Sequence, residues 1–264
     1  MCLILFAYKM HPKYKLIVAA NRDEFYERKT ASAHFWHDHP EVLAGRDLEK
    51  MGTWMGVNKN GRFAAVTNYR NPKENMIGKR SRGELVKNFL ITDIKPVDYL
   101  ETLAKKKDEY PGFNLLVGAS EELYYFSNVT NRYSKVEQGL YGLSNHLLNT
   151  DWPKVRQGKE MLSKIIMDQQ HVTSKTEATK KEEELIERLL HMLQNCDIAP
   201  DDQLPNTGIS LEMERMLSPI FIKSENYGTR SSSILLVKES EMIFHERVYS
   251  NPDQSDNHFQ IRLI

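Results

Sequence analysis

The sequence contains little cysteine: Cys2 and Cys196 are the two examples among 264 residues. Two cysteines do not make the disulfide framework of a small secreted domain, and such sparse usage is typical of a reducing compartment. Long hydrophobic runs are also lacking. The opening apolar run, Leu3 to Tyr8, is short and has no basic flank, unlike a signal peptide, and no run approaches the roughly 18 apolar residues of a membrane span. We therefore expect a soluble, cytoplasmic protein without a membrane span.

The sequence has no excess of charge of either sign. It holds 36 Lys and Arg against 36 Asp and Glu, so its formal net charge is zero. A balanced chain gives no electrostatic basis for binding nucleic acid or an anionic membrane surface. The hydrophobic fraction of 40% is enough for the core of one large domain. We expect a single domain over residues 1–264 and no nucleic-acid partner; composition does not define the oligomeric state.

Hydrophobic periodicity divides the chain into strands, a helical pair, strands, a second helical pair and strands. The Asn60-Gly61 pair is a strong hairpin signal. The expected strands span 2–8, 15–20, 52–57, 62–67, 113–118, 122–127, 139–143, 231–237 and 242–249, and the expected helical segments span 81–90, 96–105 and 152–197. Strands grouped into hairpins favour antiparallel pairing, so the expected fold class is a layered α+β domain.

Three sequence signals indicate where helices begin. Ser81-Arg82-Gly83-Glu84 has the spacing of a capping box, with Ser81 as the N-cap. Pro96 can open the next helix, and Asp151 is the expected cap of the third helical segment, with Pro153 in its first turn. The polar residues 250–264 are expected to lie over the surface.

Four polar residues, Asn21-Arg22-Asp23-Glu24, directly follow the second expected strand. Strand ends are where a sheet presents functional groups, so these side chains are candidates for a site. The alternative is an ordinary polar turn with a local Arg–carboxylate pair, which contributes little stability when it is exposed.

Cys2 immediately follows the initiator methionine and opens the first apolar run. If Met1 is removed, Cys2 carries both a thiol nucleophile and an α-amine, whose usual pKa of about 7.7–8.0 suits a base. If Met1 is retained, Cys2 has no free amine. The alternative is a structural cysteine buried at the start of a strand, since unligated cysteine is among the most buried residue types.

Three histidines, His34, His37 and His39, lie close together before Pro40. Histidines can bind a metal, but this spacing matches no established ligand pattern. We interpret the segment as a solvated loop and expect neither a metal nor another cofactor.

Polar residues suited to acyl transfer stand at strand ends or turns in five places: Cys2, Arg22 with Asp23 and Glu24, Asn68, Asn145 and Arg230. Acyl transfer needs a nucleophile, a base and neutral donors for the oxyanion, which asparagine can supply. A nearby cation lowers the pKa of a thiol. Glu24, Tyr69 and His146, which adjoin these positions in the sequence, are the expected substrate-binding residues.

Several motifs together resemble the NRDE family, also called the transport and Golgi organisation 2 family. These are Met1-Cys2, Asn21-Arg22-Asp23-Glu24, Leu43-Ala44-Gly45-Arg46-Asp47, Gly52-Thr53-Trp54, Val66-Thr67-Asn68-Tyr69-Arg70, Gly142-Leu143-Ser144-Asn145, Trp152-Pro153-Lys154-Val155 and Tyr227-Gly228-Thr229-Arg230-Ser231-Ser232. The resemblance covers nearly the whole chain, and the motifs are specific as a set.

The resemblance implies the fold of the N-terminal nucleophile hydrolases, a four-layer αββα sandwich of two mainly antiparallel sheets. It also implies that Cys2 is nucleophile and base, that Arg22 lies beside the thiol, and that Asp23 or Glu24 orients the amine. Asn68 and Asn145 match the positions of oxyanion and amine contacts, and Arg230 that of a second cation. In the related acylases the carboxylate lies three residues after the arginine, whereas here it follows immediately, so the choice between Asp23 and Glu24 is open.

Two functions of different classes follow from this interpretation. The first is hydrolysis of a non-peptide amide C–N bond in a small acyl substrate, with Cys2 as nucleophile. The second is a non-catalytic carrier or chaperone that uses the same pocket for a hydrophobic ligand, such as haem, an acyl-CoA or another lipid; His and Cys are potential haem ligands. We expect a small-molecule partner in both cases.

Overall fold

The computed structural model describes residues 2–119, 121–168, 175–249 and 254–263, which form two antiparallel sheets packed face to face. The first sheet has, among the described residues, six strands in the order β10 (Gly139–Leu143), β1 (Cys2–Tyr8), β2 (Leu16–Phe25), β11 (Tyr227–Val237), β12 (Glu241–Tyr249) and β13 (Gln254–Arg262). β1 therefore lies inside the sheet, paired on both sides with antiparallel neighbours.

The second sheet follows the chain order more simply. It runs β3 (Thr30–Phe35), β4 (Val42–Asp47), β5 (Met55–Asn58), β6 (Phe63–Asn68), β7 (Phe113–Ala119), β8 (Glu122–Ser127) and β9 (Arg132–Lys135). Each strand pairs antiparallel with the next, although β6 and β7 are joined by a long connection that contains α1 (Gly83–Leu90) and α2 (Pro96–Ala104).

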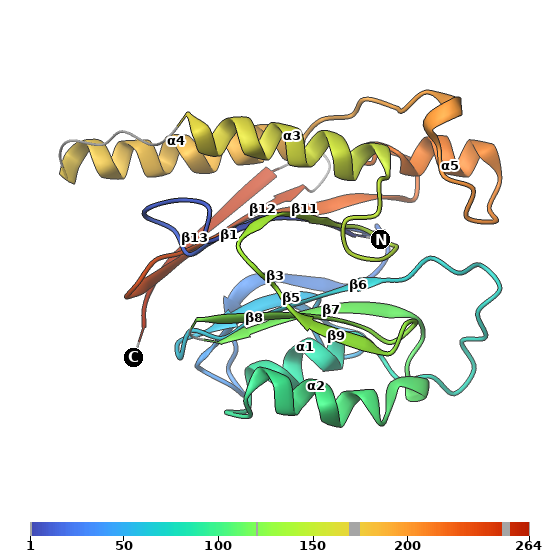
Figure 1. Ribbon diagram of the computed structural model, residues 1–264, viewed down its shortest axis with the longest axis horizontal. Coiled ribbons are helices and arrows are strands. Elements are labelled where there is room, and N and C mark those ends of the chain that lie inside the picture. Colours follow the sequence, from blue (N-terminus) through green and yellow to red (C-terminus); the bar gives the residue numbers. More distant parts are fainter. Residues whose placement is uncertain (1, 120, 169–174, 250–253, 264) are drawn as a thin grey trace.

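Helices cover the outer face of each sheet, which gives four layers (Figure 1). The long helices α3 (Pro153–Met167) and α4 (Lys175–Leu193) lie over the first sheet, and α1 (Gly83–Leu90) and α2 (Pro96–Ala104) lie over the second. A short helix, α5 (Leu211–Leu217), follows α4, and two 3₁₀ turns span Lys107–Glu109 and Asp201–Gln203. None of the described helices is long and apolar enough to cross a membrane.

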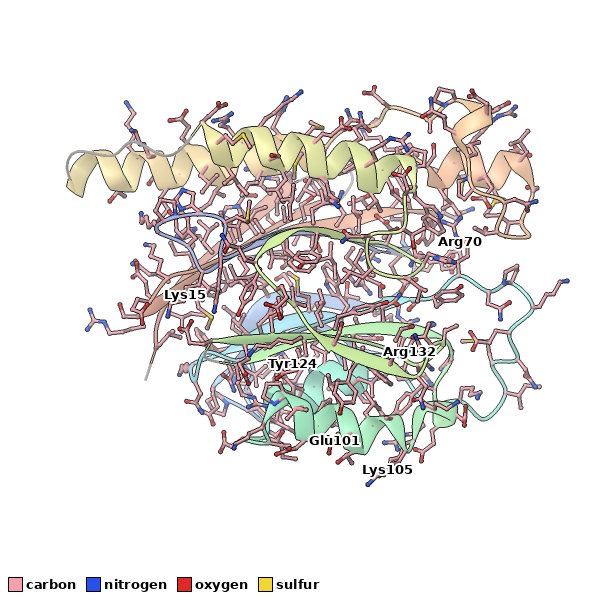
Figure 2. The ribbon with its side chains drawn as sticks, in the orientation of Figure 1. Lys15, Arg70, Glu101, Lys105, Tyr124 and Arg132 are labelled. Atoms are coloured by element: carbon pink, nitrogen blue, oxygen red, sulfur yellow. The ribbon has the colours of Figure 1, made fainter. Side chains whose placement is uncertain are left out.

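Buried apolar side chains fill the three interfaces between these layers (Figure 2). Alternation along β1 shows the division: Leu3 and Leu5 face α3 and α4, whereas Ile4 and Phe6 face the second sheet. A strand buried on both faces reads as a continuous apolar run, as the first strand does in the sequence. The expected four-layer αββα sandwich of antiparallel sheets is confirmed.

Several details of the expected secondary structure are wrong. The polar residues Asn21 to Glu24 lie within β2, because its neighbour β11 extends the pairing to Phe25. The segment 30–35, within the stretch expected as a loop, is β3. The tail lies largely at the surface as expected, but residues 254–262 form the edge strand β13, which the sequence did not predict. Edge strands tolerate polar side chains on the exposed face, which explains why polarity alone misled the interpretation.

The expected helix caps are also wrong. α1 begins one residue later than the capping box implies, with Arg82 at the N-cap position and no side-chain cap. Trp152, and not Asp151, is the N-cap residue of α3, although Pro153 does occupy its first turn as expected. The polar residues 170–180 were expected to connect two helices, but α4 already begins at Lys175; residues 169–174 are outside the described residues.

Candidate functional site

The two faces of β2 carry different polar side chains. Val18 and Ala20 face the second sheet, so strand alternation places Arg22 and Glu24 on that side. Asn21 and Asp23 face the helical layer, where the Nδ2 group of Asn21 donates to the backbone carbonyls of Leu193 and Ile220, both at 2.8 Å. The four residues of the sequence motif therefore do not form one cluster.

Cys2 lies directly opposite Arg22 in the pairing of β1 with β2. Directly opposed residues in an antiparallel pair share a face, so the thiol and the guanidinium face the same side. The Cys2 side chain is 8% exposed. Burial raises the pKa of this thiol and Asp23 adds to the rise, whereas Arg22 and a hydrogen bond from the backbone amide of Asp23 lower it.

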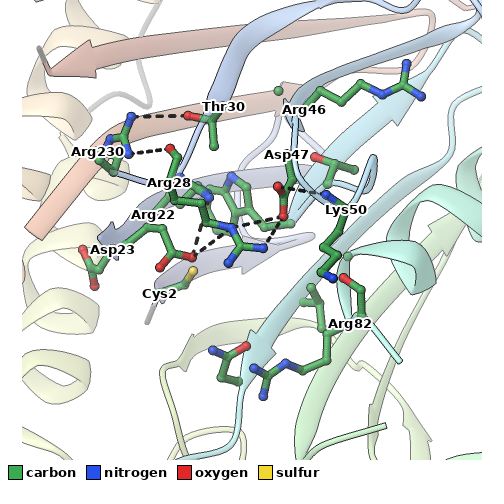
Figure 3. A pocket seen from close by; sticks show the side chains of 18 of the residues that line it. Cys2, Arg22, Asp23, Arg28, Thr30, Arg46, Asp47, Lys50, Arg82 and Arg230 are labelled. Carbon is green, nitrogen blue, oxygen red and sulfur yellow. Dashed lines mark hydrogen bonds and ion pairs between the residues drawn. The ribbon is translucent and has the colours of Figure 1, made fainter. Parts of the chain in front are cut away.

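A cavity of about 450 Å³ opens between the sheets at the Cys2 end of β1. Figure 3 shows Cys2 on one side of it and Lys50 and Arg82 on the other. Of the described residues, eight Arg and Lys line the cavity but only four Asp and Glu. The cationic residues are Arg22, Arg28, Arg46, Lys50, Lys79, Arg80, Arg82 and Arg230, and the acidic residues are Asp23, Glu24, Asp47 and Glu246. The excess of positive charge indicates an anionic ligand.

A chain of alternating charges runs along one wall of the cavity (Figure 3). Glu24 Oε2 lies 3.8 Å from Arg22 Nη2 and 3.8 Å from Arg28 Nε. Arg28 Nη2 in turn contacts Asp47 Oδ2 at 2.6 Å. Glu24 is thus shared between two guanidinium groups, which fixes Arg22 next to Cys2.

Arg230 reaches the cavity because of a β-bulge in β11. The register against β2 shifts between Thr229 and Ser231, so Arg230 is the extra residue of the bulge. Its Nη1 donates to the carbonyls of Phe25, Tyr26 and Arg28 at 2.9, 3.1 and 3.0 Å. Arg230 therefore holds the turn that follows β2, and burial lowers its pKa.

The two asparagines of the predicted site have different positions. Asn68, the last residue of β6, lines the cavity. Asn145 is fully buried behind it and donates from Nδ2 to the Asn68 carbonyl at 3.0 Å. The hydroxyl of Ser144 donates to the carbonyl of Cys2 at 3.2 Å. Asn145 and Ser144 thus connect the Asn68 and Cys2 walls of the cavity.

Tyr69 and His146 form a pair outside the cavity lining. Tyr69 Oη lies 2.9 Å from His146 Nε2, and His146 Nδ1 lies 2.8 Å from the hydroxyl of Thr150. Burial lowers the pKa of His146. Their expected contact with substrate stays a prediction, since of the described residues neither lines the cavity that contains Cys2.

Asp23 lies at the floor of the cavity and is 1% exposed. Thr229 donates its hydroxyl to Asp23 Oδ1 at 2.7 Å. Burial raises the pKa of this carboxyl, and Lys154 of α3 is the largest of the influences that lower it. The two candidate carboxylates therefore have different surroundings: Glu24 is on the same side of β2 as Arg22, whereas Asp23 accepts from Thr229 on the other side and still borders the cavity.

Sequence reasoning missed most of the charged residues around this cavity, among them Arg82, Lys50 and Glu246. Arg82 and Lys50 occur in polar segments that resemble ordinary surface, and nothing in their spacing distinguishes them. Glu246 could have been found, because it lies two residues after Phe244 on the inward face of β12, where an apolar side chain is expected. Glu246 is 4% exposed, and its Oε2 accepts from the amide of Ala33 at 2.6 Å.

The three clustered histidines are divided between β3 and the turn after it, with His34 in the strand. Within the described ranges, no three His, Cys, Asp or Glu side chains are grouped so that they could hold a metal ion.

Fold and site together define a class: a four-layer αββα sandwich with a cysteine at the start of an interior strand, facing a cation-lined cavity between the sheets. The family model described as Transport and Golgi organisation 2 matches residues 1–251, and the chain belongs to this family.

Named relatives match almost the whole chain. The Transport and Golgi organization protein 2 homolog of Homo sapiens is 34% identical over 283 residues, covering 99% of this chain and 97% of the relative. The Bos taurus homolog is 34% identical over 268 residues, covering 94% and 92% respectively. Transport and Golgi organization protein 2 of Drosophila melanogaster is 30% identical over 280 residues, covering 96% and 94%.

Solved structures of two hydrolases are similar to the chain at low sequence identity. An N-acylethanolamine-hydrolyzing acid amidase ortholog from Caenorhabditis elegans is 8% identical, with a TM-score of 0.48, over 89% of this chain and 92% of that chain. A mutant of the conjugated bile acid hydrolase from Clostridium perfringens is 11% identical, with a TM-score of 0.43, over 100% and 97%.

Proposed function

We propose that the protein is a cysteine hydrolase that cleaves the amide C–N bond of a small acyl substrate bound in the cavity between the sheets. The observation that carries this proposal is the position of Cys2, whose side chain lines the cavity directly opposite Arg22. A structural cysteine does not require a guanidinium beside it, whereas a thiolate nucleophile is stabilised by one.

In this mechanism, removal of Met1 gives Cys2 an α-amine that takes the thiol proton. Sγ attacks the carbonyl carbon, and the side-chain amide of Asn68, in the cavity wall, supplies a donor for the oxyanion. The tetrahedral intermediate collapses when the C–N bond breaks and the leaving amine takes up the proton. Water then hydrolyses the thioester, which releases the acid and restores the thiol.

The charge of the cavity narrows the substrate class to acyl amides that carry an anionic group. Among the described residues, neither Lys50 nor Arg82 forms an ion pair with a carboxylate, although both line the cavity. Arg82 donates to the Gly112 carbonyl at 3.1 Å, and burial lowers its pKa. An anion bound between these two cations compensates their charge at the wall that faces Cys2.

The experiment combines intact-mass measurement with hydrolysis of a panel of amides. The protein is produced in cells that contain Met aminopeptidase, and Cys2→Ala is compared with Cys196→Ser, the matched control at the exposed cysteine. We expect loss of Met1, hydrolysis by the wild type and the control, and none by Cys2→Ala. Retention of Met1 on all molecules, together with no hydrolysis of any amide, would reject the proposal.

A carrier of an anionic hydrophobic ligand, such as haem or an acyl-CoA, is the second candidate, and the cation-rich lining is the observation that favours it. Titration with haem, followed by absorbance, distinguishes this function. Saturable binding that is unchanged in Cys2→Ala, without hydrolysis of any amide, would favour the carrier over the hydrolase.

A further inference from the structure

One acidic residue of the cavity has no cation paired with it. Glu24 forms ion pairs with Arg22 and Arg28, and Arg28 also pairs with Asp47. Glu246 lines the same cavity and is 4% exposed, but among the described residues it forms no ion pair. Burial of a carboxylate is costly unless an opposite charge lies close to it, so this position favours a ligand that brings a positive charge.

Neutral donors hold the Glu246 carboxylate in place. Its Oε2 accepts from the backbone amide of Ala33 at 2.6 Å, and Ala33 lies within the register shift of β3 against β4. Burial raises the pKa of Glu246, whereas Ala33 and Ser231 lower it by hydrogen bonding. Arg22 and His34 lower this pKa less, through their charges. A carboxylate has about four lone-pair positions, so these neutral donors leave capacity for a further donor.

A glycine keeps the second oxygen of this carboxylate accessible. Gly45 lines the cavity and belongs to a motif that the proposed reaction does not use. A Cβ at Gly45 would lie 3.6 Å from Glu246 Oε1 and 3.2 Å from the carbonyl oxygen of Ala31. The next residue, Arg46, pairs with Asp38 at 2.5 Å. This part of β4 therefore neither covers Oε1 nor supplies its counter-charge.

Strand pairing fixes how far Glu246 lies from Cys2. The register places Cys2 opposite Arg22 and Arg22 opposite Ser231. Ser231 is in turn opposite Val248 of β12, and opposed residues share a face. Glu246, two residues before Val248, is on that face as well. Three strand spacings amount to about 14 Å, so a group bound at Glu246 lies several bonds away from an amide at Cys2.

The anion site and Glu246 lie in different parts of the cavity. Figure 3 shows Thr30, the first residue of β3, on the opposite side of the view from Arg82. Glu246 is bonded to Ala33 on this same strand. A ligand that reaches both places carries its positive and negative groups at separate positions.

We propose that Glu246 Oε1 and the space beside Gly45 form a subsite for a primary ammonium group at the distal end of the substrate. The inference rests on the proposed hydrolase function and narrows its substrate class to acyl amides that carry an ammonium group as well as an anionic group. Glu246 is a specificity-determining residue in this scheme, because it binds the substrate and takes no part in breaking the C–N bond.

Paired amide substrates test the subsite during hydrolysis. The two members of each pair share the scissile amide and the anionic group, and one ends in an ammonium group where the other ends in a methyl group. We expect the wild type to favour the ammonium member about tenfold or more in kcat/KM, at the chain length that reaches Glu246. Glu246→Gln keeps an oxygen for the Ala33 amide but loses the charge, so this preference disappears. Glu225→Gln, at an exposed position, is the matched control and retains it.

Binding to Cys2→Ala protein tests the subsite without hydrolysis. Calorimetric titrations compare ω-amino acids of increasing chain length with the matching fatty acids. We expect the best ω-amino acid to bind about tenfold more tightly than its fatty acid, and this difference to disappear when Glu246→Gln is added. If no amide is hydrolysed by the wild type but this difference is found, the proposed function fails and the subsite stands.

Three results would overturn the inference: no binding of any ω-amino acid, equal binding of both series, or a preference that Glu246→Gln retains. If Glu246→Gln does not fold, Gly45→Ala replaces it, since its methyl group lies against Oε1 and should reduce the preference. An undiminished preference in folded Gly45→Ala protein would then count against the subsite.

Discussion

The two faces of β2 differ in what their polar side chains contact, although these side chains alternate along one strand. Arg22 and Glu24 face a cavity and can reach a ligand, and Glu24 forms ion pairs with Arg22 and Arg28. Asn21 and Asp23 face the helical layer and are almost completely buried. On the cavity face, charge is available for binding and chemistry. On the helical face, polar groups are satisfied by protein partners, so their substitution affects stability and protonation.

The largest expected effect on activity comes from substitution of Cys2, which faces the cavity. Cys2→Ala should reduce kcat by about a thousandfold or more, because the covalent route is lost. The melting temperature should change little, because one sulfur atom at the edge of a cavity is removed. Steady-state kinetics and thermal unfolding are measured on the same preparations. Full activity in Cys2→Ala would rule out a mechanism with Cys2 as nucleophile.

The second effect concerns the helical face and depends on pH. The pKa of Lys154 is lowered in the folded protein to about 8 from 10.5, so between these values the unfolded chain binds more protons. The contribution of Lys154 to the free energy of unfolding therefore rises with pH across this window, by about 3 kcal/mol. Urea unfolding of the wild type and Lys154→Met at several pH values gives this difference. A difference that is flat from pH 8 to 10.5 would show that Lys154 titrates normally.

The third effect is on the free energy of unfolding and concerns Asn21, the neutral polar residue that β2 directs toward the helical layer. Asn21→Ala leaves the carbonyls of Leu193 and Ile220 without this donor and the Ser232 hydroxyl without its acceptor, Asn21 Oδ1 at 2.6 Å. We expect a loss of about 2 kcal/mol in the free energy of unfolding. Asn226→Ala, at an exposed position, is the matched control. Equal midpoints in urea for both variants would contradict the structural role of Asn21.

The smallest effect tests the anion site of the cavity face. Arg82→Gln should raise KM about tenfold for an amide that carries an anionic group and leave KM for its neutral analogue unchanged, which corresponds to about 1.4 kcal/mol. Lys73→Gln, an exposed position on the preceding loop, is the control. An equal increase for both substrates would show that Arg82 shapes the cavity without binding the anion.

Most strands and helices, and the layered α+β class, were predictable because they depend on apolar periodicity, whereas the four-layer order was implied by the family resemblance. The strand runs at 2–8 and 113–118 and the helix opened by Pro153 are patterns that tertiary context does not override. The extent of β2 was not predictable, because Asn21 to Glu24 are polar and their strand conformation is imposed by pairing with β1 and β11. β13 was missed for the same reason.

The composition of the candidate site was only partly predictable. Cys2, Arg22 and Asn68 do line one cavity, although nothing in their sequence separation requires it. Asp23 and Glu24 lie on opposite faces of β2 because successive side chains in a strand alternate. This difference would have been predictable if the second expected strand had been extended by four residues. Lys154 carried a readable signal, because it shares a spacing of four with the buried Gly158 and Leu162. The bulge at Arg230 depends on register and has no such signal.

The walls of the cavity come from residues as early as Cys2 and as late as Val248. During synthesis the thiol leaves the ribosome first, while Glu246 and Arg230 are still to be added. The nascent chain thus exposes the thiol long before the rest of the cavity exists. Under the proposed function, a chain that lacks the last strands of the first sheet would carry the nucleophile without a complete binding cavity, so we expect it to hydrolyse no amide.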